Sequence, residues 1–182
     1  MEFIPCELPE IILIKPRIVA DDRGCFAETW HGARFAAAGI PGPFVQDNYS
    51  HSRRHVLRGL HFQIAQSQGK LVSVVRGAVF DVVVDLRRSS PRFGRWCGAA
   101  LTAENRHMLW VPPGFAHGFL TLSDTADFVY KCTEYYAPQF ERSLRWNDPD
   151  IAIAWPLPPG TAPVLSAKDA AAPSFRDAET FP

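Results

Sequence analysis

Short runs of β-forming residues, each bounded by residues that favour turns, dominate this sequence. Sixteen prolines and twelve glycines are spread along the whole chain. Many short strands separated by turns are typical of a β-sandwich or a β-barrel. The sequence therefore predicts an all-β fold of the jelly-roll type. The expected strands cover residues 11–14, 44–49, 55–63, 70–76, 78–86, 96–101, 107–111, 118–122 and 126–135.

One of these runs, residues 78–86, indicates a strand that is covered on both faces. Phe80 and Val82 alternate with Val79 and Val83, and successive side chains of a strand point to opposite faces. Both faces of this run therefore carry apolar side chains. Such a strand needs packed layers on either side, as in a sandwich or a filled barrel.

Turn and helix signals complete the predicted outline. Gly77, between the runs 70–76 and 78–86, predicts a tight hairpin turn. Helix signals are few. Residues 31–38 are rich in alanine and are followed by a glycine, which favours a short helix. Residues 167–172 predict one or two further helical turns. The expectation is thus a β-rich fold with a few short helices.

Length and charge favour one domain and disfavour a general nucleic-acid binder. A chain of 182 residues can bury a substantial core as one domain, so we expect a single domain over 1–182. The Pro- and Ala-rich tail, 156–182, is expected to pack on the barrel. Nineteen basic residues balance nineteen acidic ones, whereas nucleic-acid binders usually carry a basic excess.

The cysteines and the absence of targeting signals predict a cytoplasmic protein. The four cysteines, at positions 6, 25, 97 and 132, show no short paired spacing. Neither a zinc ribbon nor a disulfide scaffold fits this pattern. No secretory signal is visible at the start, and no apolar run is long enough to span a bilayer. We expect no membrane association.

His61 lies in an apolar run close to a concentration of cationic residues. A single histidine in such a run is more often a core residue than a catalyst. Its neighbours change that balance, because they form a positive focus in a chain of zero net charge: His51, Arg53, Arg54, His55 and Arg58. This focus is either a solvated rim or a site for an anion such as a diphosphate.

Arg58 and His61 are three residues apart, so in a regular strand their side chains would point to opposite faces. A β-bulge adds one residue to a strand and re-aims the side chains on either side of it. Gly59 is a plausible place for a bulge. A bulge there would bring the cation and the imidazole to the same face.

Lys70 and Tyr130 are further candidates for chemistry. Lys70 begins an apolar run, and such a lysine usually only marks the end of a strand. In a dry pocket, however, its charge stabilises a developing oxyanion. Tyr130 lies between Phe128 and Cys132 on one face of its run, where core packing is the simplest interpretation. Opposite a base, a tyrosine can act as a general acid.

His117 follows Pro112, Pro113 and Gly114 with the Pro-x-Gly-x-x-His spacing of the second motif of cupins, which often supplies a metal ligand. A metal-binding cupin also needs two histidines separated by one residue in an earlier strand. Here that region offers His61-Phe62-Gln63, with no second histidine. Three ligands on one face are therefore not provided, and we expect no metal.

Taken in order, the motifs of this chain resemble the dTDP-4-dehydrorhamnose 3,5-epimerase family. The resemblance runs from Asp21 to about Pro173, which is nearly the whole chain. So many ordered blocks at family-like spacing make the match highly specific. The matching blocks are Asp22-Arg23-Gly24 with Phe26 and Glu28, Gln46-Asp47-Asn48, VLRGLHFQ at 56–63, QGKLV at 68–72, RGAVFDVVVDLRRSSPRFGRW at 76–96, LWVPPGFAHGF at 109–119 and LSAKDAAAP at 165–173.

The resemblance implies a metal-free, cupin-type jelly roll that acts as a homodimer without a cofactor. It implies conversion of dTDP-4-dehydro-6-deoxy-D-glucose into dTDP-4-dehydro-L-rhamnose in dTDP-rhamnose biosynthesis. A ketone at carbon 4 acidifies the hydrogens on carbons 3 and 5, so a base can form an enolate and an acid can reprotonate the other face. No redox cofactor is needed, and the chain has no glycine-rich dinucleotide loop.

By the same resemblance, His61 is the general base and Asp169 holds its tautomer. Tyr130 is the acid on the opposite face of the sugar, and Lys70 stabilises the enolate oxygen. The residues expected to bind the nucleotide sugar are Arg23, Phe26, Glu28, Gln46, Asp47, Asn48, Arg58, His117, Tyr136, Glu141 and Lys168. Phe26 and Tyr136 are the candidates for stacking on thymine or covering the sugar.

The chain departs from the family pattern in places, and alternatives stay open. The loop 64–67 is one residue short, and Ser73 stands where an arginine is frequent, which is expected to alter substrate contacts. Within the family, the alternatives are an epimerase acting at carbon 3 or carbon 5 only and a related ketoisomerase. From another class, an inactive sugar-binding cupin would have lost a proton-transfer residue, yet all are retained.

Overall fold

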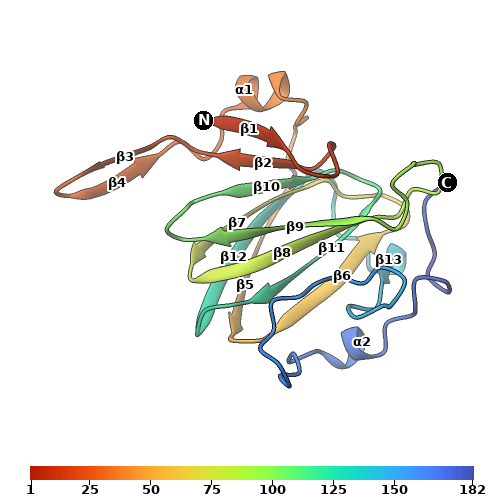
Figure 1. Cartoon of the computed structure of the whole chain (residues 1–182). Helices are drawn as coiled ribbons and strands as arrows, with labels where there is room; N and C mark the ends of the chain where they lie inside the picture. The colour runs from red at the N-terminus through yellow and green to blue at the C-terminus, as the bar shows by residue number, and fades with distance from the viewer.

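Two antiparallel sheets packed face to face form the body of the molecule in a computed structural model that describes residues 1–182 (Figure 1). The six-stranded sheet has the order β1 (Glu2–Pro5), β2 (Ile12–Lys15), β10 (Met108–Val111), β7 (Lys70–Arg76), β12 (Thr125–Cys132) and β5 (Gln46–Arg53). The five-stranded sheet has the order β13 (Glu141–Ser143), β6 (Leu57–Gln63), β11 (Phe115–Thr121), β8 (Ala78–Asp85) and β9 (Trp96–Thr102). The predicted all-β sandwich is confirmed.

The helices are short, as the sequence predicts. The helix α1 (Gly32–Ala37) begins at His31, whose side chain accepts a hydrogen bond from the backbone of Arg34. The helix α2 (Ala167–Ala170) begins at Ser166, which caps it by accepting from the backbone of Asp169. Such caps satisfy backbone N–H groups at a helix start. A single 3₁₀ turn, η1 (Pro138–Phe140), completes the set.

The strand β8 is covered on both faces, as its sequence predicts. Val79 and Val83 belong to the core between the two sheets. Val82 and Val84 point the other way and pack in a second cluster, which includes aromatic side chains of the C-terminal tail. The tail thus covers the outer face of the five-stranded sheet. Burial of these apolar side chains is the main stabilising contribution of both layers.

The turn at Gly77 is present, but the hairpin predicted there is wrong. Gly77 has a positive φ of 76°, and an added Cβ would lie 2.0 Å from the carbonyl oxygen of Thr125. The strands β7 and β8 on either side of it belong to different sheets. The tight turn therefore carries the chain from one layer of the sandwich to the other. A turn within a hairpin and a turn between two sheets need the same residue types, so the sequence around Gly77 does not distinguish them.

A bulge occurs at Gly59 in β6, as predicted. His61 is opposite His117 on β11, whereas Arg58 is opposite Phe119, so three steps on β6 match two steps on β11. Gly59 has a φ of 108°, and an added Cβ would lie 2.7 Å from the carbonyl oxygen of His117. Only glycine fits this backbone without strain. The extra residue turns Arg58 and His61 to the same side.

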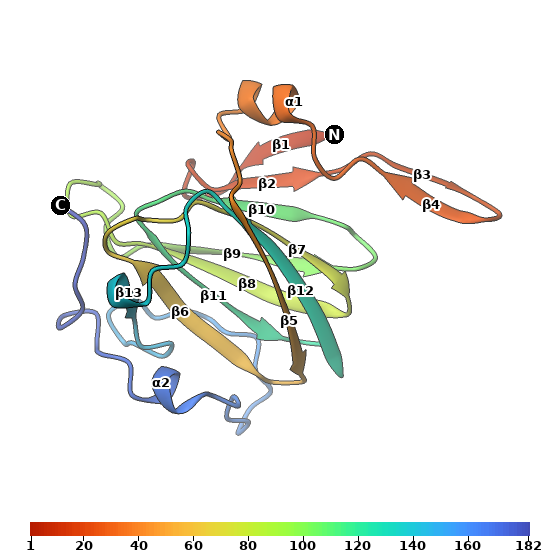
Figure 2. The same cartoon turned by 180° about the vertical axis from the view of Figure 1, so that it is seen from behind.

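A third, two-stranded sheet projects from the sandwich as an arm (Figures 1 and 2). It consists of β3 (Ile18–Asp21) and β4 (Gly24–Ala27), joined by a tight turn. Ile18, Val19 and Phe26 are exposed, and 72% of Phe26 is accessible. We call this segment, residues 18–27, the projecting hairpin. The sequence did not predict its strands, nor β1 and β13. No helix of the structure has the length and apolar character needed to cross a membrane.

Candidate active site

A cavity of about 260 Å³, here called the inner cavity, is bounded by side chains from both sheets and from the segment that contains α2. The strands β5, β7 and β12 contribute from one sheet, and β6 and β11 contribute from the other. All four residues expected to be catalytic lie here. The lining residues are Ser50, Arg58, His61, Lys70, His117, Gly118, Phe119, Phe128, Tyr130, Ser166, Lys168 and Asp169.

His61 and Asp169 form a close pair at the wall of the inner cavity. The distance from His61 Nε2 to Asp169 Oδ1 is 2.5 Å. The Ser166 hydroxyl donates to the other carboxylate oxygen at 2.9 Å. Burial alone would raise the pKa of Asp169, but the hydrogen bond and charge of His61, with Ser166, lower it below its usual value. An ionised Asp169 keeps a proton on Nε2, so Nδ1 holds the free lone pair.

Lys70 is the first residue of β7, and its side chain points toward the inner cavity. The Lys70 side chain is partly buried, and its amine has no hydrogen-bond or ion-pair partner within the chain. Burial lowers the pKa of Lys70, while the nearby Cys132, Glu141 and Asp81 oppose that change. The arrangement provides a cation that is free to meet a negative charge on a ligand.

Tyr130 lies on the inner face of β12, and the centroid of its ring is 6.0 Å from that of the Phe128 ring. Burial raises the pKa of Tyr130, as do the nearby Cys132 and Glu141, while Arg58 opposes this. The phenol therefore keeps its proton through the neutral range. A protonated phenol can act as a general acid.

Under the inner cavity, His117 pairs with a buried carboxylate that sequence reasoning missed. His117 Nε2 lies 2.9 Å from both carboxylate oxygens of Asp81, whose side chain is 0% exposed. Burial raises the pKa of Asp81, and His117 and Lys70 oppose that shift. A signal was present, because Asp81 interrupts the apolar face formed by Val79 and Val83. A carboxylate at such a position needs a buried partner.

At one end of the inner cavity, Tyr136, Glu141 and Lys168 form a polar cluster. The Tyr136 hydroxyl donates to Glu141 Oε2 at 2.8 Å, and Lys168 Nζ lies 2.5 Å from the same oxygen. Gln46 connects to this cluster because its Oε1 accepts from the backbone of Tyr136 at 2.8 Å. Its amide also donates to Asn48 Oδ1 at 3.0 Å. Five of the residues expected to bind the nucleotide sugar are thus brought together.

Four other residues expected to bind the nucleotide sugar lie elsewhere. Arg23 and Phe26 are on the projecting hairpin, in a separate shallow pocket. Glu28 forms an ion pair with Arg34 beside α1. Asp47 points outward from β5 and pairs with Lys131. None of the four lines the inner cavity of its own protomer.

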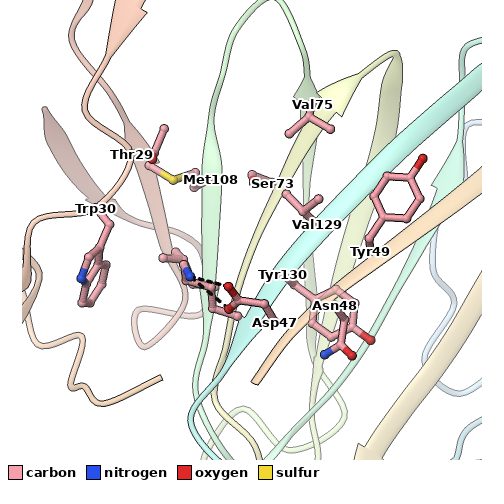
Figure 3. Close-up of a pocket in the computed structure, with 12 residues that line it drawn as sticks. Thr29, Trp30, Asp47, Asn48, Tyr49, Ser73, Val75, Met108, Val129 and Tyr130 are labelled. Atoms are coloured by element: carbon pink, nitrogen blue, oxygen red, sulfur yellow. Dashed lines mark hydrogen bonds and ion pairs between the residues drawn. The ribbon is translucent and has the colours of Figure 1, made fainter. Parts of the chain in front are cut away.

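A larger cavity, of about 430 Å³, lies on the outer face of the six-stranded sheet (Figure 3). We call it the outer pocket. Trp30, Tyr49, Val75 and Val129 give it a mostly apolar lining, and the Asp47–Lys131 ion pair borders it. Ser73 also points here (Figure 3). The expectation that Ser73 alters contacts inside the substrate site is therefore not supported, because its strand aims it at the opposite face.

The arrangement of the His, Cys, Asp and Glu side chains does not form a metal site. No cluster of three or more His, Cys, Asp or Glu side chains is spaced to hold a metal ion. His117 of the cupin-like motif has Asp81 as its partner instead. The four cysteines are free.

Two packed antiparallel sheets with a polar cavity between them define a protein of the cupin type. The family model described as dTDP-4-dehydrorhamnose 3,5-epimerase matches residues 5–177. The chain therefore belongs to the dTDP-4-dehydrorhamnose 3,5-epimerase family. The expected isomerase class, 3,5-epimerase activity and cupin-type fold are confirmed.

Individual relatives agree over nearly the full length. The chain is 54% identical to the dTDP-4-dehydrorhamnose 3,5-epimerase of Pseudomonas aeruginosa, over 96% of both chains. The crystal structure of a dTDP-6-deoxy-D-glucose-3,5-epimerase from Legionella pneumophila, in complex with dTDP-4-keto-L-rhamnose, is 50% identical, with a TM-score of 0.93 over 97% of this chain and 93% of that one. A 3'-monoepimerase from Streptomyces bikiniensis, in complex with dTDP-quinovose, is 39% identical, with a TM-score of 0.88 over 94% and 87%.

Proposed function

We propose that this epimerase converts dTDP-4-dehydro-6-deoxy-D-glucose into dTDP-4-dehydro-L-rhamnose within the inner cavity, by enolate formation and reprotonation at carbons 3 and 5. The observation that carries the proposal is that His61, Lys70 and Tyr130 line one cavity together with Asp169. The relative from Legionella pneumophila binds a dTDP-4-keto sugar, which supports this class of ligand. The four free cysteines suit a cytoplasmic enzyme.

His61 is the general base in this proposal. Its Nε2 proton is held by Asp169 at 2.5 Å, so Nδ1 accepts the proton from the carbon next to the ketone. The imidazolium that forms is stabilised by the same carboxylate. A positioned base typically contributes about 10²–10⁴ to the rate.

Lys70 stabilises the enolate and Tyr130 completes the inversion. The ketone oxygen gains negative charge when the proton leaves, and the unpaired Lys70 ammonium meets that charge. Tyr130 then donates its proton to the other face of the carbon. Solvent restores both groups, and the same cycle serves the second carbon.

Basic side chains around the inner cavity bind the diphosphate. Arg58, His117 and Lys168 line the cavity, and the bulge at Gly59 turns Arg58 toward it. The Arg58 guanidinium is steadied by Ser52 Oγ at 2.9 Å. Tyr136 is half-exposed and covers the nucleotide end of the site, with its hydroxyl held by Glu141. Planar cations and ammonium groups are suited to phosphate oxygens.

The enzyme acts as a homodimer in which the projecting hairpin of one protomer completes the site of the other. Arg23 and Phe26 are exposed on an arm that extends away from its own sandwich (Figures 1 and 2). The outer pocket offers a second copy a largely apolar sheet face. Exposed apolar surface of this kind marks an interaction site. A partner would supply the hairpin residues that the inner cavity lacks.

Mixing two inactive variants should restore activity if the hairpin acts across the dimer. One variant carries His61→Ala, and the other carries Arg23→Glu with Phe26→Ala. After dissociation and re-pairing, a mixed dimer has one intact site, so about a quarter of all sites become active. Epimerase assays at low substrate and light scattering measure the outcome. A monomer in solution, or no recovery in a confirmed mixed dimer, would refute this arrangement.

In deuterated water, the enzyme should place deuterium at both carbon 3 and carbon 5 of the 4-keto sugar nucleotide. Each inversion removes a carbon-bound hydrogen and returns one from solvent through Tyr130. Proton NMR of the recovered product measures the loss of both signals. Label at one carbon only would identify a mono-epimerase, the alternative that the relative from Streptomyces bikiniensis represents.

A further inference from the structure

A buried thiol lies beside the proposed catalytic residues without a role in the reaction described above. Cys132 is 0% exposed at the end of β12, two residues after Tyr130, so both side chains point to the inner side of the sheet. In the register of the sheet, Cys132 is directly opposite Lys70 on one side and Gln46 on the other. The Cβ atoms of such opposed residues are about 4.5–5.5 Å apart. The thiol therefore borders the stem of Lys70.

Cys132 also terminates a chain of side-chain hydrogen bonds from the nucleotide end of the site. The backbone N–H of Tyr136 donates to Gln46 Oε1 at 2.8 Å, and Gln46 Nε2 donates to Asn48 Oδ1 at 3.0 Å. Asn48 Nδ2 then donates to Cys132 Sγ at 3.6 Å. Because both ends of the Asn48 amide are occupied, its orientation is fixed.

The chemistry of sulfur explains why Lys70 stays unpaired. Sulfur is a weak hydrogen-bond acceptor, whereas a hydroxyl or a carboxylate at the same position would accept strongly from the ammonium. Burial raises the pKa of the Cys132 thiol, although the charge of Lys70 and the hydrogen bond from Asn48 oppose the shift. The thiol is thus neutral at neutral pH. It does not neutralise the charge on Lys70.

We propose that Cys132 is a positioning residue of the epimerase: its sulfur orients the Asn48 amide, and its neutrality leaves the Lys70 ammonium free for the substrate oxygen. This inference rests on the proposed function and deepens it. It explains why a buried thiol occupies a strand position that faces the site. It also predicts that different replacements at position 132 produce different kinetic defects.

Three variants test the two parts of the role. Cys132→Asp places a carboxylate beside Lys70, so we expect kcat to fall about a hundredfold. Burial lowers the pKa of Lys70. In the pH profile of kcat, activity should therefore fall on the alkaline side at a lower pH than the pKa of an ordinary lysine, because Lys70 loses its charge there. The new ion pair should move this alkaline limb to higher pH. Cys132→Ser should also lower kcat and move the limb to higher pH, but by less than Cys132→Asp does. Cys132→Val should raise KM severalfold, with the limb unmoved, because only the Asn48 acceptor is lost.

The measurements are pH profiles of kcat and KM on the full-length enzyme, with circular dichroism to verify folding. Cys97→Val is the matched control: it removes another buried thiol outside the inner cavity and should alter neither parameter. If Cys132→Asp and Cys132→Ser keep the wild-type alkaline limb, or Cys132→Val keeps the wild-type KM, the inference is wrong. A wild-type enzyme that does not epimerise the 4-keto sugar would instead refute the proposed function.

Discussion

Replacing His61 with Ala should lower both the rate of deuterium uptake at the two carbons and kcat by about 10²–10⁴. Two imidazoles line the inner cavity, and each has a carboxylate partner. His61 is paired with Asp169 at the wall of the cavity, whereas His117 is held by the fully buried Asp81. In the proposed mechanism, no other residue takes a proton from that face of the sugar. The loss should appear in the exchange rate as well as in net turnover, since proton removal is the first step.

The control for this variant is His107→Ala, which removes a histidine side chain that lies outside the inner cavity. It should retain wild-type exchange. Circular dichroism and thermal melting of both variants separate a catalytic loss from unfolding. Exchange at the wild-type rate in a folded His61→Ala enzyme would show that another residue is the base.

Sequence reasoning could predict those parts of the site that depend on local geometry. The alternation in residues 78–86 is fixed by the period of a strand, so β8 was correctly expected to be covered on both faces. The bulge at Gly59 could also be anticipated, because Arg58 and His61 can share a face only if the strand gains a residue. In both cases, the residues that predict the feature lie in the same strand as the feature itself.

Features that depend on distant parts of the chain were not predictable in this way. The strands β3 and β4 have no buried face, so their sequence lacks the apolar alternation that identifies a strand. The strand that follows Gly77, β8, pairs in the other sheet from β7. The residue at the turn does not specify in which sheet the next strand pairs. Ser73 was expected near the substrate, yet the pleat of β7 directs it to the outer pocket.

The pairing of His117 with Asp81 shows a third kind of limit. The cupin-like motif around His117 suggested a possible metal ligand, and the absence of a second histidine argued against it. The structure gives the physical alternative, because the fully buried carboxylate of Asp81 lies diagonally across the two strands from His117 and 2.9 Å from its imidazole. The register of β8 and β11 decides which buried polar residues of the two strands come into contact. A single sequence does not specify that register.

Replacing Tyr130 with Phe should separate proton removal from inversion. Without the phenol, His61 still removes the proton and can return one from solvent to the same face. We therefore expect deuterium to enter the unreacted sugar while net epimerisation falls by about 10²–10⁴. Because burial raises the pKa of Tyr130, the wild-type phenol remains protonated in mildly alkaline solution, and the alkaline limb of kcat belongs to Lys70.

The two processes are measured on one sample by NMR of recovered substrate and product after incubation in deuterated water. Tyr135→Phe is the matched control, because its ring is exposed and does not line the inner cavity. It should match the wild type in both readouts. Product formed at the wild-type rate by Tyr130→Phe would exclude the phenol as the acid. Loss of exchange together with inversion would show that Tyr130 is needed for proton removal as well, so that the two faces of the sugar are not served by separate groups.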